Sequence, residues 1–157
     1  VVTWSYIESM QQCVGRDARY ANLQEAAQQI RAVSQGFGPV PQDIWMALCS
    51  HMVRQRPDGL LGLHYDPAIG EPIRALTAQA AQQGEAVIWQ LYDQIQAQVM
   101  LIRGRESDLL TEATAQAMTQ RGPKAQLVQW DGVGHAPTLT DPEHIQVVAD
   151  FVLDSAP

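Results

Sequence analysis

The sequence predicts an α/β fold that is mostly helical overall, with its two strands near the carboxyl end. Val99–Ile102 is a continuous apolar run, typical of a strand buried on both faces of a parallel sheet. Ala125–Trp130 predicts a second strand. Between residues 20 and 90, apolar side chains recur with helical spacing and no parallel-strand pattern appears. The order expected is therefore a helical region followed by strand, helix, strand and helix.

Capping and turn residues mark the limits of the first helices. Trp4–Val14 has apolar residues at helical spacing and ends at Gly15. The next helix begins with a capping-box pattern at Asn22–Glu25 and ends before Gly36–Pro39. Its predicted inner face is formed by Leu23, Ala26, Ala27, Ile30 and Val33.

A further helix follows Pro41, which the first turn of a helix tolerates, and ends before a turn signal at Arg56–Gly59. Leu60–Tyr65 is expected to be extended. A helix over residues 73–80 is expected to end before Gly84. This stretch is thus predicted to be largely helical.

The carboxyl-terminal helices have clear start signals. Thr111 is a predicted N-cap of the helix between the two strands, which ends before Gly122. Asp141 followed by Pro142 starts the last helix. Its apolar face is formed by Ile145, Val148, Ala149 and Val152.

Composition excludes several classes of protein. The net charge of −7 and ten scattered Lys and Arg residues argue against nucleic acid as a partner. No apolar run reaches the length of a membrane helix and no signal-peptide layout is present, so we expect no membrane partner and a cytoplasmic location. Cys13 and Cys49 lack C-x-x-C spacing, which predicts reduced packing residues rather than a disulfide or zinc site.

Two polar side chains follow the two predicted strands. Asp108 comes after Val99–Ile102, and His135 comes after Ala125–Trp130 within the sequence Gly-Val-Gly-His. A right-handed crossover places the carboxyl ends of neighbouring parallel strands at the same edge of the sheet. We therefore expect the carboxylate of Asp108 to meet the imidazole of His135, although each motif alone also occurs in loops without function.

This pair has the chemistry of the acid and base of a catalytic triad. A carboxylate holds a neutral imidazole in one tautomer and stabilises it when it takes a proton. The nucleophile that such a triad needs sits in a G-x-S-x-G motif, which the sequence lacks. The serines present lack the flanking glycines and are not expected to act as nucleophiles: Ser5, Ser9, Ser34, Ser50, Ser107 and Ser155.

No cofactor or metal is predicted. His135, Asp141 and His144 lack the compact spacing of metal ligands. Cys49 and His51 would point in different directions on a helix, which favours a packed thiol beside an exposed imidazole.

At these residues the sequence resembles the carboxyl-terminal half of an α/β-hydrolase, in the cap-bearing group that includes esterases and carbon–carbon bond hydrolases. Arg103–Asp108 looks like the turn after the seventh strand of that fold, and Gly132–His135 like the turn after the eighth. Tyr20–Trp89 looks like the inserted lid, and Pro142–Leu153 like the closing helix. The resemblance covers nearly all of this chain but only about half of a typical member.

The resemblance implies a division into a helix and linker over residues 1–19, a helical cap over 20–90 and a carboxyl-terminal α/β portion over 91–157. It implies hydrolysis of a small ester or related carbonyl compound, with Asp108 as the acid and His135 as the histidine. The nucleophile and the oxyanion hole would precede this chain, so the chain alone is expected to be inactive. The resemblance does not separate an esterase from a lactonase, a dehalogenase or an acyltransferase.

Two parallel strands are too few for a stable sheet. An open strand edge is a template for pairing, so we expect either self-association or pairing with the missing half. The alternative function is a noncatalytic interaction or oligomerisation module derived from the same fold. An upstream nucleophile motif would favour the enzyme.

Overall fold

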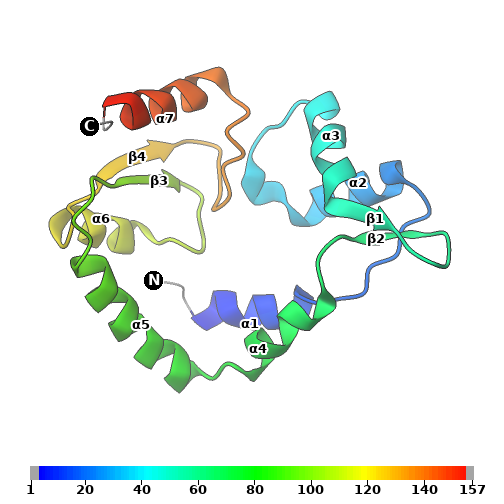
Figure 1. Cartoon of the computed structure of the whole chain (residues 1–157), viewed down its shortest axis with the longest axis horizontal. Coiled ribbons are helices and arrows are strands. Elements are labelled where there is room, and N and C mark those ends of the chain that lie inside the picture. The colour runs from blue at the N-terminus through cyan, green and yellow to red at the C-terminus, as the bar shows by residue number, and fades with distance from the viewer. Residues whose placement is uncertain (1–3, 155–157) are drawn as a thin grey trace. The chain divides into compact units, whose positions relative to one another are not determined.

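The computed structural model describes residues 4–154 and divides into two compact units, each of which is described by itself (Figure 1). Within the described residues, Trp4–Gln35 and Val40–Thr77 form the amino-terminal unit. The carboxyl-terminal unit contains Gly36–Pro39 and residues 78–154. Ser155 lies outside the described residues.

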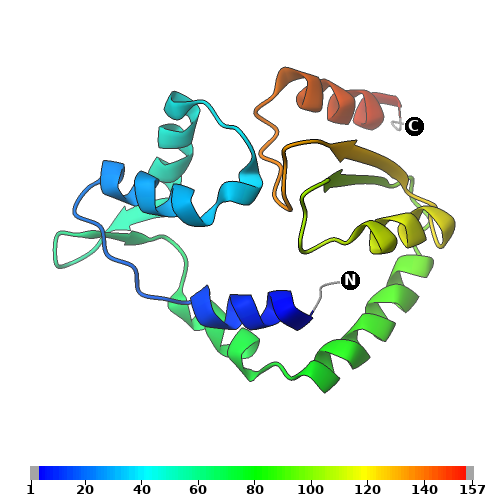
Figure 2. The same cartoon turned by 180° about the vertical axis from the view of Figure 1, so that it is seen from behind.

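A parallel pair of strands lies at the centre of the carboxyl-terminal unit. Strand β3 (Met100–Gly104) pairs with β4 (Gln126–Trp130), and the register runs from Met100 opposite Gln126 to Gly104 opposite Trp130. Both views show the two arrows side by side and pointing the same way (Figures 1 and 2). The parallel arrangement predicted from the two apolar runs is confirmed.

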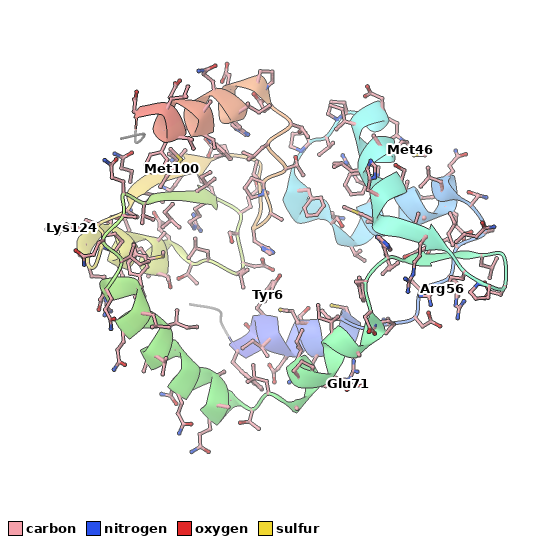
Figure 3. All side chains as sticks on the ribbon, in the orientation of Figure 1. Tyr6, Met46, Arg56, Glu71, Met100 and Lys124 are labelled. Atoms are coloured by element: carbon pink, nitrogen blue, oxygen red, sulfur yellow. The ribbon has the colours of Figure 1, made fainter. Side chains whose placement is uncertain are left out.

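The first three residues of β3, beginning with Met100 (labelled in Figure 3), are only half buried. This differs from the expectation that Val99–Ile102 is buried on both faces. Within residues 4–154, β3 has one neighbouring strand in its sheet, so it lacks the second partner that covers an internal strand. Burial instead increases toward the carboxyl end of β3, where Arg103 and Gly104 are buried.

The carboxyl-terminal unit also contains the helices α5 (Ala78–Asp93), α6 (Glu112–Gln120) and α7 (Pro142–Asp154). The hydroxyl of Thr111 accepts a hydrogen bond from the N–H of Thr114, as expected of an N-cap. The carboxylate of Asp141 likewise accepts from the N–H of Glu143 at the start of α7. The expected start of each of these two helices is confirmed.

Helix α5 continues through Gly84, where the sequence predicted a helix end. Glycine costs only about 1 kcal/mol relative to alanine inside a helix, so tertiary contacts can override it. Two such contacts hold the far end of α5: Tyr92 Oη donates to the carbonyl of Met118 at 2.8 Å, and Arg121 Nε donates to Asp93 Oδ1 at 2.7 Å. The hydrogen bond from Arg121 lowers the pKa of the Asp93 carboxyl.

The amino-terminal unit is mainly helical. Its elements are α1 (Trp4–Cys13), α2 (Leu23–Val33), α3 (Gln42–Met52), β1 (Val53–Gln55), β2 (Leu61–Leu63), the 3-10 turn η2 (Pro67–Ile69) and α4 (Gly70–Ala75). In a second 3-10 turn, η1 (Gln35–Phe37), Gln35 belongs to the amino-terminal unit and the next two residues belong to the carboxyl-terminal unit. The single helix predicted over residues 73–80 is wrong, because the backbone is extended at Leu76, between α4 and α5.

The core of the amino-terminal unit is built around Trp45 of α3. Its side chain is 1% exposed, and its indole Nε1 donates to the carbonyl of Ala27 on α2 at 2.9 Å. The guanidinium of Arg31 lies over the same ring, 4.7 Å from its centroid. Val33, which was predicted on the inner face of α2, is instead 84% exposed at the helix end.

The two cysteines differ in environment. Cys49 is fully buried, as predicted, and burial raises the pKa of its thiol, which makes it unreactive. Cys13 is exposed at the end of α1, so the prediction that it is a packing residue is wrong. His51, two residues beyond Cys49, is exposed as expected.

An antiparallel hairpin interrupts the helical region. Strand β1 pairs with β2, with Val53 opposite Leu63. Strand β2 lies within Leu60–Tyr65, the segment that the sequence predicts to be extended. Strand β1 was not predicted, because three residues are too few to show an alternating pattern.

Among residues 4–154, we find no helix with the length and apolar character needed to cross a membrane.

Candidate active site

The loops that follow β3 and β4 are hydrogen-bonded to each other. The N–H of Arg105 donates to the carbonyl of Trp130 at 2.9 Å, and the N–H of Glu106 donates to the carbonyl of Val133 at 3.1 Å. These bonds continue the pairing of the two parallel strands beyond the sheet. The two loops therefore leave the same edge of the sheet as a joined pair.

Gly104, the last residue of β3, permits this close approach. A Cβ atom added there would lie 2.1 Å from the carbonyl oxygens of both Val133 and Gly134. Real Cβ atoms are essentially never below 3.0 Å from such atoms, and backbone cannot yield as a flexible side chain can. Only glycine fits at this position without displacing the loop after β4.

Gly104→Ala should therefore destabilise the chain by about 3 kcal/mol, the upper part of the range for an overpacked site. Urea denaturation of the chain measures this change. Gly84→Ala is the matched control, because nothing lies within 4 Å of its added Cβ atom and alanine favours the helix. Equal stabilities of the two variants would show that the two loops do not meet at Gly104.

The structure places both predicted catalytic residues in these loops. Asp108 lies in the loop after β3, and His135 lies in the loop after β4. Both residues are exposed. The hydrogen bond from Glu106 to Val133 brings the two loops together just before each of these residues, while the pairing of Asp108 with His135 itself stays a prediction.

A residue that is distant in the sequence also holds the backbone just before His135 in place. The N–H of Gly134 donates to the carbonyl of Gly36 at 2.9 Å, and a Cβ atom at Gly134 would lie 2.6 Å from the Cα atom of Gly36. Both glycines belong to the carboxyl-terminal unit. The sequence marked Gly36 only as part of a helix stop, and no local pattern indicates this contact.

The loop that carries Asp108 begins with a tight turn. The N–H of Ser107 donates to the carbonyl of Gly104 at 3.0 Å, and the hydroxyl of Ser107 accepts from the N–H of Leu110 at 3.0 Å. Ser107 is 9% exposed. Its hydroxyl thus has a structural partner within the loop.

A small cavity lies beside the loop after β4. Its volume is about 150 Å³, and its lining includes Val133, Pro137, Asp141 and His144. The ring of His144 is stacked on Trp130, with centroids 3.7 Å apart.

Among residues 4–154, no three His, Cys, Asp or Glu side chains are grouped closely enough to hold a metal ion.

Comparisons with known proteins show that the chain is similar to hydrolases in sequence and in structure. It is 34% identical over 150 residues to a 3-hydroxybutyrate-oligomer hydrolase of Cupriavidus necator, covering 94% of this chain and 51% of that protein. The structure is similar to an α/β hydrolase of Novosphingobium aromaticivorans, with 26% identity, a TM-score of 0.79 and coverage of 99% of this chain and 53% of the other.

A third similarity is to the structure of E-2-(acetamidomethylene)succinate hydrolase, at 16% identity and a TM-score of 0.74, covering 98% of this chain and 53% of the other. No protein-family model matches the chain. The chain spans about half the length of each of these three relatives.

Proposed function

We propose that this chain, which belongs to the α/β-hydrolase fold family, supplies the acid and the histidine of a catalytic triad in an ester hydrolase. The observation that carries the proposal is the joining of the loops of Asp108 and His135 at the carboxyl edge of two parallel strands. Open α/β sheets bind their ligands at this edge. The relatives, all hydrolases, do not favour a noncatalytic module.

In the proposed mechanism, Asp108 accepts a hydrogen bond from Nδ1–H of His135, which fixes the tautomer in which Nε2 carries no proton and acts as the base. Nε2 takes the proton of the nucleophile's hydroxyl as its oxygen forms a bond to the ester carbonyl carbon. The same proton then passes to the leaving alkoxide as the bond between the acyl carbon and that oxygen breaks. Water releases the acyl group in the same way.

The nucleophile and the oxyanion hole come, in this proposal, from a segment upstream of this chain. The complete enzyme is thus the chain together with that upstream half. The carboxyl-terminal unit exposes apolar side chains that the upstream half would cover in the complete enzyme. These residues are Val87, Ile88 and Leu91 on α5, and Ile145 and Val152 on α7. Strand β3 also offers an edge for a further strand.

A fluorophosphonate probe should distinguish the chain from the complete enzyme. The probe reacts with an activated serine, which the proposal places in the upstream half. The chain alone should therefore remain unlabelled, and the complete enzyme should be labelled on an upstream serine, both measured by intact-protein mass spectrometry. Labelling of any serine within this chain would contradict the assignment.

For the substrate class we propose an ester that joins small hydroxy acids, by analogy with the 3-hydroxybutyrate-oligomer hydrolase of Cupriavidus necator. Linear oligomers of a hydroxy acid are linked by ester bonds, which is the bond that the proposed triad cleaves. The test is release of 3-hydroxybutyrate from its linear dimer by the complete enzyme. Cleavage of simple aryl esters without cleavage of the dimer would keep the ester hydrolase and remove this substrate class.

A further inference from the structure

We propose that Arg103 is a positioning residue that holds the loop of Asp108 in place for the triad, an inference that rests on the proposed function. Arg103 lies near the carboxyl end of β3 and is only 7% exposed. Arginine is almost never so buried unless its charge is paired or its N–H groups are hydrogen-bonded. The partners of this guanidinium therefore indicate its role.

The guanidinium binds both ends of the loop that contains Asp108. Its Nε donates to the carbonyl of Leu110 at 2.8 Å, and its Nη2 donates to the carbonyl of Arg105 at 3.2 Å. Asp108 lies between these two carbonyls in the sequence. A planar group with donors in a fixed fork thus sets the separation of the two ends of the loop.

The third bond fixes the guanidinium itself to the neighbouring strand. Its Nη1 donates to Oε1 of Gln129 on β4 at 3.1 Å, and Arg103 is directly opposite Gln129 in the strand register. The loop of Asp108 is thereby held to β4, the strand that leads to His135. Ser107 adds to this arrangement, because its hydroxyl accepts from the N–H of Leu110 while Arg103 binds the carbonyl of the same residue.

The proposed triad requires the loop of Asp108 to be positioned accurately. A carboxylate orients an imidazole only within hydrogen-bonding distance, and a displacement of about 1 Å in an active site can lower the rate by about 100-fold. Asp108 is exposed, so packing around its side chain does not hold it. The hydrogen bonds from Arg103 to the main chain on either side of it do so instead.

Arg103→Met in the complete enzyme tests the role. Methionine keeps an unbranched apolar stem like that of arginine but removes the guanidinium and with it all three donors. We expect kcat to fall about 10- to 100-fold with KM unchanged, because Arg103 acts through Asp108 and not on the substrate. In the same enzyme, the amide protons of Ser107 and Leu110 should exchange with solvent faster than in the unchanged sequence.

Tyr92→Phe is the matched control for a general loss of stability. It also removes one side-chain donor to a main-chain carbonyl in the same unit, that of Met118, but this bond is not part of the Asp108 loop. Its kcat and the amide exchange of Leu110 should equal those of the unchanged protein. A kcat of Arg103→Met within twofold of Tyr92→Phe would overturn the positioning role.

Gln129→Leu keeps the test decisive if Arg103→Met does not fold. It removes one of the three partners of the guanidinium and leaves the bonds to Arg105 and Leu110 in place. We expect a smaller, severalfold loss of kcat with faster exchange at Leu110, and an unchanged kcat would count against the proposal. An inactive unchanged enzyme refutes the proposed function, whereas an active one with unaffected variants refutes the positioning role alone.

Discussion

His135→Ala in the complete enzyme should lower kcat by about 10⁵- to 10⁶-fold, the loss expected when the general base of a triad is removed. Without the imidazole, no group takes the proton of the nucleophile or returns it to the leaving alkoxide. His135 is exposed in the loop after β4, so its removal should leave the fold intact. Steady-state kinetics and thermal unfolding measure the two effects.

The matched control for His135→Ala is His51→Ala. His51 is also exposed, but it lies on α3 in the amino-terminal unit. Its replacement should leave kcat within about twofold of the unchanged enzyme, as is usual for a surface substitution. If His135→Ala keeps more than a tenth of the original kcat, His135 is not the base.

Asp108→Asn should lower kcat by about 10⁴-fold, as loss of the carboxylate does in a triad of this type. Asparagine has nearly the same shape as aspartate, but its amide can donate to the imidazole and favour the wrong tautomer. It also does not stabilise the positive charge that the imidazole gains. The measurement is kcat in the complete enzyme, together with a melting temperature that should stay close to that of the unchanged protein.

Glu106→Gln is the control for the choice of acid. Glu106 is an exposed carboxylate in the same loop, and its contribution to the loop is the main-chain hydrogen bond to Val133, which the substitution keeps. We expect its kcat to change by less than about threefold. A larger loss in Glu106→Gln than in Asp108→Asn would assign the acid to Glu106.

Much of the carboxyl-terminal unit follows from local sequence patterns. Two apolar runs predict the parallel strands, and the capping residues Thr111 and Asp141 mark the starts of two helices. Strand polarity then requires the loops of Asp108 and His135 to leave the same edge of the sheet. These inferences need no knowledge of which residues meet across the fold.

The contacts that hold the loops of the candidate site in place could not be predicted in this way, because they are tertiary contacts. The apolar pattern ends at Ile102, whereas β3 continues through Arg103 and Gly104. A buried arginine is not expected from sequence, since its burial depends on partners such as Gln129 on the other strand. The contact of Gly134 with a glycine far upstream likewise leaves no local signal.

A double-mutant cycle on kcat tests most directly whether Asp108 and His135 act as one unit. In the complete enzyme, Asp108→Asn alone should lower kcat by about 10⁴-fold, but in the background of His135→Ala it should change the residual rate by less than about twofold. This result is expected because a carboxylate that acts through an imidazole has no role once the imidazole is gone. Losses that multiply in the double variant would contradict the pairing of these two residues.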